Sequence, residues 1–139
     1  MPRIMALDVG TKTIGVAATD PLAMFSQPIC TIARKGVAKD TLALLELFKK
    51  WEPTLVVVGM PYELDGTEER SARLARQIGE AVAEATGLPV EYMDERFTSV
   101  MAERSLIRAD MSRAKRKKVI DQAAAMEILD SWLAQRPRP

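Results

Sequence analysis

Residues 3–18 read Arg-Ile-Met-Ala-Leu-Asp-Val-Gly-Thr-Lys-Thr-Ile-Gly-Val-Ala-Ala, and this stretch predicts a β-hairpin. Its first half, Arg3–Asp8, is apolar at both sets of alternating positions, which is typical of a central strand covered on both faces. Val9–Lys12 forms the turn, with a glycine inside it, and Thr13–Ala18 resumes strand character. We therefore expect the sheet to start as an antiparallel pair built around this first strand.

After the hairpin, predicted strands and helices alternate along the chain. Leu55–Gly59 is a short apolar strand of the kind found in parallel sheets. The other predicted elements are strands over Ile29–Ala33 and Val90–Asp94, helices over Asp40–Trp51, Thr67–Gly87 and Thr98–Arg108, and a last helix ending near Ala134. This order predicts an α/β fold: a mixed sheet, antiparallel over its first three strands and parallel after them, with helices on both faces.

Length and composition favour one domain. The chain has 139 residues, of which 47% are hydrophobic and 28% charged, the usual proportions of a globular protein. We expect a single domain over residues 1–135, followed by a short frayed tail over 136–139. The longest apolar runs are far shorter than the ~20 residues of a membrane helix. The N-terminus lacks the apolar stretch of a signal peptide. We therefore expect a cytoplasmic protein with no membrane partner.

The chain has no histidine and a single cysteine, Cys30, which narrows the available chemistry. Zinc sites built from Cys and His are excluded, as are catalytic triads and general bases that use histidine. Cys30 cannot close an intramolecular disulfide, and we expect it to be a small buried apolar residue rather than a nucleophile. Catalysis must therefore use carboxylates, lysines, hydroxyls or a hard metal ion held by oxygen ligands.

Acidic residues occur at three places in the sequence where a ligand-binding site could form. Asp8 ends the first strand and Asp94-Glu95 ends the last, and parallel strands bring their carboxyl ends to one edge of the sheet, where ligands gather. On a helical wheel, Asp121 lies at the centre of the apolar face of the last helix. A lone ionised carboxylate buried there costs several kcal/mol, so it needs a partner. That partner is either a basic residue such as Arg96 or a metal ion, and each strand-end acid could equally cap a turn.

Three carboxylates without histidine suit Mg²⁺ or Mn²⁺, which take oxygen ligands and keep waters and phosphate oxygens in their shell. Two such ions about 4 Å apart can activate a water and stabilise the leaving oxygen of a phosphodiester cleavage. Glu95 could instead position that water. These residue types therefore indicate a nuclease that depends on a divalent metal.

A strongly basic segment covers residues 104–118, with Asp110 as its one acid. Its basic residues are Arg104, Arg108, Arg113, Lys115, Arg116, Lys117 and Lys118. Five such contacts to a single-stranded nucleic acid would give a log–log salt slope of about −3.5. The segment could also be a solvated helix face or a loop. Lys12 joins it as a candidate for holding a polyanionic substrate, and Arg96 either binds the scissile phosphate or pairs with Asp94.

Several stretches of the sequence resemble motifs of the YqgF family, which is also called RuvX. In chain order they are Ala6–Ala17, Val58–Pro61, Leu64–Glu68, Asp94–Ser99 and Ile120–Ala125, and together they span nearly the whole chain. The resemblance implies an RNase H-like fold related to RuvC-type Holliday junction resolvases. It also implies a nuclease that processes the 5′ end of pre-16S ribosomal RNA with a divalent metal.

Carried over by position, the resemblance implies an acidic triad of Asp8, Glu95 and Asp121, the same acids that the strand ends and the helical wheel indicate. The chain departs from the family pattern twice. Asp121 stands in Ile-Asp-Gln where Asp-Ser is common, which keeps the carboxylate. RuvC-type enzymes have a fourth acid near the third, whereas the nearby acids here, Glu127 and Asp130, point away from Asp121 on the wheel. This departure counts against a full site of four carboxylates and two metal ions.

Two other functions stay open. A nucleic-acid-binding module that keeps the fold without cleaving would gain nothing from three acids facing a phosphate backbone. An actin-like ATP-binding lobe also carries an acid followed by Gly-Thr between two strands, as in Asp8–Thr11, but that fold needs a chain more than twice as long. A homodimer would suit a two-fold DNA junction as substrate, and no heptad pattern in the sequence demonstrates one.

Overall fold

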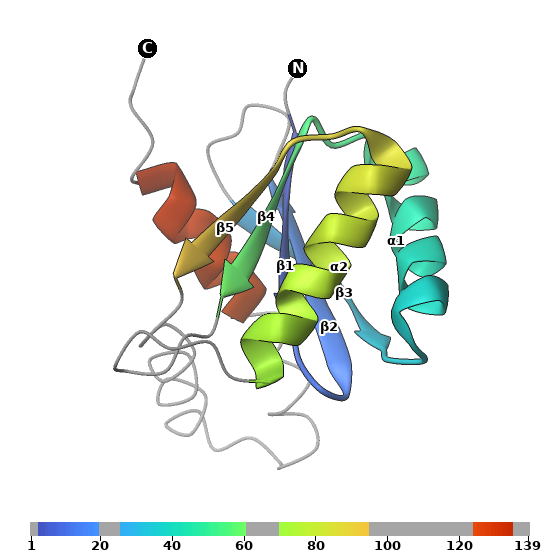
Figure 1. Cartoon of the computed structure of the whole chain (residues 1–139). Helices are drawn as coiled ribbons and strands as arrows, with labels where there is room; N and C mark the ends of the chain where they lie inside the picture. Colours follow the sequence, from blue (N-terminus) through green and yellow to red (C-terminus); the bar gives the residue numbers. More distant parts are fainter. Residues whose placement is uncertain (1–2, 20–25, 61–69, 95–123, 135–139) are drawn as a thin grey trace.

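The computed structural model describes residues 3–19, 26–60, 70–94 and 124–134 (Figure 1). Its strands are β1 (Ile4–Val9), β2 (Thr13–Thr19), β3 (Ser26–Ala33), β4 (Leu55–Met60) and β5 (Val90–Asp94). Its helices are α1 (Val37–Trp51), α2 (Arg70–Thr86) and one over residues 124–134, which we call the C-terminal helix. Within these ranges no helix is long and apolar enough to cross a membrane. The helix predicted over Thr98–Arg108 lies outside them.

The five strands form one mixed sheet in the order β3-β2-β1-β4-β5. β2 pairs antiparallel with both β1 and β3. β4 pairs parallel with both β1 and β5. The predicted change from antiparallel to parallel pairing is confirmed, and β1 is the central strand. Every strand except β2 therefore ends at the same edge of the sheet, which we call the carboxyl edge.

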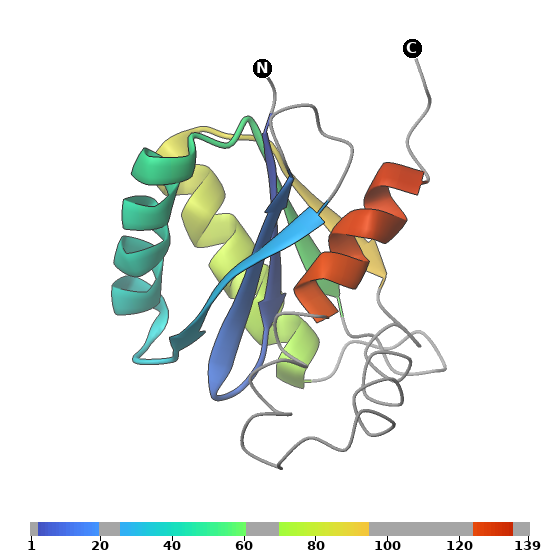
Figure 2. The ribbon, with the colours of Figure 1, turned by 180° about the vertical axis from the view of Figure 1, so that it is seen from behind.

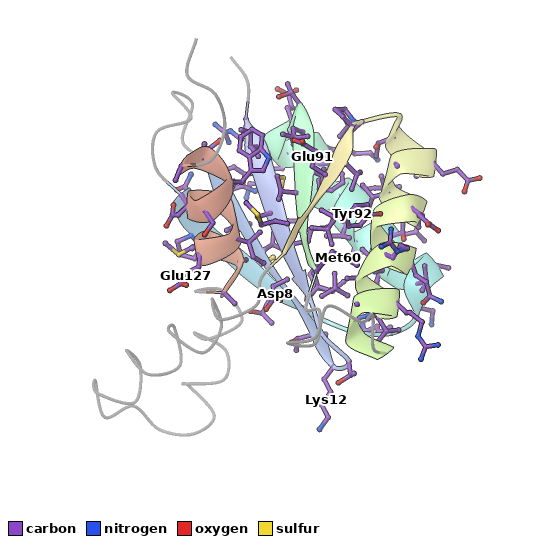
Figure 3. All side chains as sticks on the ribbon, turned by 60° about the vertical axis from the view of Figure 1, so that its left-hand side comes forward. Asp8, Lys12, Met60, Glu91, Tyr92 and Glu127 are labelled. Carbon is purple, nitrogen blue, oxygen red and sulfur yellow. The ribbon has the colours of Figure 1, made fainter. Side chains whose placement is uncertain are left out.

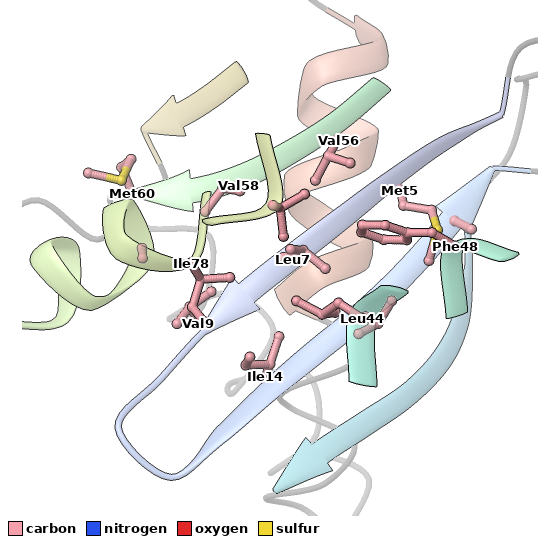
Figure 4. Packing of buried hydrophobic residues seen from close by; sticks show 14 of the residues in the cluster. Met5, Leu7, Val9, Ile14, Leu44, Phe48, Val56, Val58, Met60 and Ile78 are labelled. Atoms are coloured by element: carbon pink, nitrogen blue, oxygen red, sulfur yellow. The ribbon is translucent and has the colours of Figure 1, made fainter. Parts of the chain in front are cut away.

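Helices cover both faces of the sheet, as expected (Figures 1 and 2). On one face α1 and α2 pack over a core that includes Met5, Leu7, Leu44, Phe48 and Ile78 (Figure 4). On the other face the C-terminal helix packs over a smaller core that includes Ile4, Ala6, Val57, Met93 and Ile128. The central strand is thus apolar on both sides because it contributes to both cores.

β3 is longer than the sequence suggested, starting at Ser26 rather than Ile29. The extension includes Pro28, which pairs with Ala17, and the register shifts between Val16 and Ala17. A proline has no N–H to donate, so within sheets it is confined to edge strands and irregular positions. β3 is the edge strand beside β2, which explains why the proline does not end it.

α1 begins at Val37 rather than at Asp40, with Gly36 at its N-cap and no side chain capping it. Asp40, in the first turn, has another use: its side chain is only 1% exposed and pairs with the guanidinium of Arg34. Arg34 Nε donates to one carboxylate oxygen at 2.6 Å, and the backbone N–H of Lys35 donates to the other at 2.8 Å. The acid expected to open the helix is thus half of a buried ion pair.

The same arginine holds the turn between β1 and β2. Arg34 Nη1 donates to the carbonyl oxygen of Gly10 at 2.9 Å. The backbone N–H of Arg34 donates to the carbonyl oxygen of Lys12, also at 2.9 Å. Inside the turn, the Gly10 N–H donates to the Thr13 carbonyl at 2.8 Å. The Arg34–Asp40 pair therefore ties the hairpin turn to the start of α1.

Loss of Asp40 should destabilise the fold strongly. Removing one partner of a buried ion pair leaves an uncompensated charge, which costs about 3–5 kcal/mol. We expect Asp40→Ala to lower the free energy of unfolding by about that amount in urea denaturation followed by circular dichroism. Glu46→Ala is the matched control on α1, because Glu46 pairs with Lys49 while both side chains are at least 75% exposed. Such surface pairs contribute about 0–1 kcal/mol, so equal losses in the two variants would contradict the prediction.

Candidate active site

Asp8 is the first polar side chain along the central strand. It precedes the last residue of β1 and is half-buried. Strand alternation places it with Ile4 and Ala6, on the face that the C-terminal helix covers. Figure 3 shows Asp8 at the carboxyl edge, below that helix. Asp8 thus stands at the strand end that the sequence indicated.

Both strand neighbours of Asp8 are glycines. On one side Asp8 pairs directly with Gly15 of β2. On the other side Leu7 pairs with Val58 of β4, so the position level with Asp8 is Gly59. Because neither glycine carries a side chain, neither adjacent strand covers the Asp8 carboxylate, and the backbone permits a ligand to approach closely. An oxygen ligand in such surroundings fits a hard divalent cation.

β5 brings a second acidic strand end to the carboxyl edge. Asp94, its last residue, pairs with Met60 of β4. The Asp8 and Asp94 strand ends lie at one edge of the sheet, and β4 lies between the two strands. Two strand spacings separate β1 from β5 by roughly 9.6 Å. Along β4, Gly59 is level with Asp8 and Met60 with Asp94, so β4 separates the two strand ends.

Most of the predicted site residues lie outside the described part of the chain. These are Glu95 and Asp121 of the triad, and Arg96, Arg104, Arg108, Arg113, Lys115, Arg116, Lys117 and Lys118 of the nucleic-acid-binding set. Among the described residues, no three His, Cys, Asp or Glu side chains form a group that could hold a metal ion. Lys12 is described, and it is exposed at the tip of the β1–β2 turn (Figure 3). The structure thus brings Asp8 and Lys12 to one edge.

The C-terminal helix presents the predicted face to the sheet. Its buried residues are Ala124, Ala125, Ile128 and Leu129, whereas Asp130 is exposed. Glu127 is half-buried, and Figure 3 shows its side chain directed away from Asp8. Burial raises the pKa of the Glu127 carboxyl, and the nearby Asp130 carboxylate adds to the rise. The helical wheel was right that Glu127 and Asp130 lie off the face that meets the sheet.

Cys30 and the two tryptophans, Trp51 and Trp132, have structural contacts of their own. Cys30 is half-buried in β3, and burial raises the pKa of its thiol, which disfavours the nucleophilic thiolate. The Arg3 guanidinium lies 5.0 Å from the centre of the Trp51 ring, and Trp132 Nε1 donates to Glu91 at 3.1 Å. Each of the two tryptophans thus contacts a charged side chain.

Sequence reasoning missed two features of this region. Gly15 and Gly59 each interrupt an otherwise apolar strand, and an isolated glycine in a strand is a recognised sign of close backbone approach, so a signal was available. No pattern in the sequence indicated the Arg34–Asp40 ion pair. Charged residues six positions apart in a loop and a helix are common, and only burial distinguishes this pair.

Proteins of similar sequence point to one family of nucleases and resolvases. The chain matches the RuvX family, described as Holliday junction resolvase, over residues 2–135. Two curated relatives carry the provisional name pre-16S rRNA nuclease. The relative from Myxococcus xanthus is 46% identical over 136 residues, covering 97% of this chain and 90% of its own. The relative from Moorella thermoacetica is 46% identical over 131 residues, covering 94% of each chain.

Solved structures of low sequence identity share the fold. Thermus thermophilus RuvC in complex with a Holliday junction substrate has a TM-score of 0.58 at 18% identity, covering 97% of this chain and 96% of its own. The fowlpox virus resolvase with Holliday junction DNA has a TM-score of 0.62 at 12% identity, covering 95% and 97%. The expected RuvC-like, RNase H-like fold is therefore confirmed. With a family match that runs almost from end to end and relatives 46% identical over nearly their whole length, this chain belongs to the RuvX family.

Proposed function

We propose that this chain is a nuclease that hydrolyses phosphodiester bonds with the help of a divalent metal, and that it processes the 5′ end of the 16S rRNA precursor. The observation that carries the proposal is the place of Asp8. It is a half-buried carboxylate between two glycines, at the edge where β5 leads through Asp94 to Glu95. The names of the curated relatives support the RNA substrate. A substrate of this kind would place the protein in the cytoplasm.

Asp8, Glu95 and Asp121 would hold the metal. Three carboxylates form the oxygen donor set that Mg²⁺ and Mn²⁺ prefer. When bound, the metal supplies charge stabilisation to the attacking and leaving oxygens of the phosphate. The described residues contribute by positioning: the central strand holds Asp8 in place, and Gly59, level with it on β4, adds no side chain beside the carboxylate.

The cationic side chains would bind the polyanionic substrate. Lys12 extends from the turn four residues after Asp8, so it can contact a phosphate close to the cleaved bond. The basic segment over residues 104–118 would add contacts whose strength falls as salt rises. Arg96, the residue after Glu95, is the candidate for the scissile phosphate itself.

A four-way DNA junction is the second candidate substrate, favoured by the description of the family as Holliday junction resolvase. A junction has two-fold symmetry, so this activity would call for a homodimer. If the chain only binds nucleic acid, its carboxylates are dispensable. The experiments below separate these cases.

Asp8→Asn should abolish cleavage while leaving binding intact. Loss of a metal ligand removes several kcal/mol of transition-state stabilisation, which lowers the rate by about a thousandfold. The measurement is cleavage of labelled pre-16S rRNA and of a labelled four-way DNA junction, with Mn²⁺ or with a chelator. Asp130→Asn is the matched control, because Asp130 is exposed on the C-terminal helix. A wild-type rate in Asp8→Asn, or cutting that persists in chelator, would contradict the proposed mechanism.

The three acids should act as one unit. We expect Glu95→Gln and Asp121→Asn to lose activity as Asp8→Asn does, because one incomplete metal site is as inactive as another. Combining two of the substitutions should then cost little more than one, as is usual for residues that act together. Single-turnover cleavage rates of the single and double variants test this. Losses that multiply in the double variants would show that the acids act independently.

A further inference from the structure

Three exposed lysines lie at the carboxyl edge, beyond the hairpin turn from Asp8. Lys12 is in the β1–β2 turn, Lys35 is in the connection that follows β3, and Lys39 is in the first turn of α1. β3 runs in the same direction as β1, and Ala33 at its end pairs with Thr13. The start of α1 is therefore at the same edge as the proposed active site, on the opposite face of the sheet.

The backbone around these lysines is fixed. The hydrogen bond from the Arg34 N–H to the Lys12 carbonyl sets the two connections side by side, and the Arg34 side chain is bonded to both Asp40 and Gly10. Lys35 and Lys39 line one shallow hollow of about 340 Å³ between the end of β3 and α1. We call these three residues, which the Arg34 hydrogen bonds hold at one edge, the lysine surface.

Among the described residues, no acid compensates the positive charge of the lysine surface. The acid that lines the hollow, Asp40, is already paired with Arg34. In the part of the chain that the structure describes, none of Lys12, Lys35 and Lys39 takes part in an ion pair. Grouped lysines without acidic partners attract polyanions, because each phosphate contact releases a condensed counterion.

We propose that Lys12, Lys35 and Lys39 form a phosphate-binding surface for the nucleic acid that is cleaved at Asp8. The inference rests on the proposed function and extends it to residues that neither the sequence analysis nor the family resemblance assigned, Lys35 and Lys39. The substrate backbone crosses the carboxyl edge at the β1–β2 turn, where Lys12 lies, and continues along the start of α1. Lysines in this role act as point charges, so they hold the strand without reading its sequence.

The test compares two double variants whose substitutions lie in α1 or in the connection just before it. Lys35→Gln/Lys39→Gln removes two charges from the lysine surface, and Lys49→Gln/Lys50→Gln removes two exposed charges near the other end of α1. Ten helical residues, about 15 Å, separate Lys39 from Lys49. Binding of a fluorescein-labelled single-stranded RNA to the full chain is measured by anisotropy, with chelator present, between about 50 and 200 mM salt. Thermal melts confirm that both variants fold.

Each phosphate contact to a single strand contributes about 0.7 to the log–log salt slope. We therefore expect Lys35→Gln/Lys39→Gln to reduce the slope by about 1.4 and to weaken binding about 25-fold at 0.1 M salt. Lys49→Gln/Lys50→Gln should leave both quantities at the wild-type value. Adding Lys12→Gln to the first variant should reduce the slope by a further 0.7 or so. Equal slopes in the two double variants would overturn the proposal. The three lysines would then be candidates for binding a partner of another kind, such as an acidic protein.

The outcomes distinguish a failure of the lysine-surface proposal from a failure of the proposed nuclease function. If RNA binds with the expected loss in Lys35→Gln/Lys39→Gln but the wild type cleaves no substrate, the lysine surface stands and the nuclease assignment is wrong. If the wild type cleaves and Asp8→Asn does not, while the slopes of the two double variants coincide, the nuclease assignment stands and the lysine surface is wrong.

Discussion

The packing of every other described element follows from the burial of β1 on both faces of the sheet. Every side chain from Ile4 to Leu7 is at most 3% exposed, and successive residues enter two separate cores. A strand in this position must be apolar at every residue, and it needs helices above and below. An ionised carboxylate in its middle would cost several kcal/mol without a partner. Asp8 comes where the strand reaches the carboxyl edge, the first position along it at which a charge is tolerable.

The strand directions then decide what can meet at that edge. Because β3, β4 and β5 all run with β1, four strand ends and the connections after them are gathered there. The Arg34–Asp40 pair adds rigidity by holding the hairpin turn against the start of α1. A metal-ligating carboxylate and a phosphate-binding surface both gain from this, since a group already held in place loses little entropy when its ligand arrives.

Particular residues show how far the sequence could be read. The apolar residues at successive positions of Arg3–Asp8 and the glycine turn after them were sufficient to predict the hairpin and its central place. The valines of Leu55–Gly59 were sufficient to predict a buried parallel strand. The wheel over the last helix placed Asp130 outward correctly. β3 was read three residues short because Pro28 suggests a strand boundary, and only its pairing with Ala17 at an edge shows otherwise. The predicted helix starts three residues after the observed start of α1 at Val37, and its first residue, Asp40, is a buried ion-pair partner.

Residue types and their short-range spacing were enough to predict the periodic elements, to exclude histidine chemistry and to identify the acids near the strand ends. The three-dimensional fold was needed to show that β4 separates β1 from β5, that glycines lie on both sides of Asp8, and that Lys12, Lys35 and Lys39 share one edge. Strand order and the pairing of distant residues follow from how the whole chain satisfies its hydrogen bonds and buries its apolar surface at once, and no local pattern of residues carries that information.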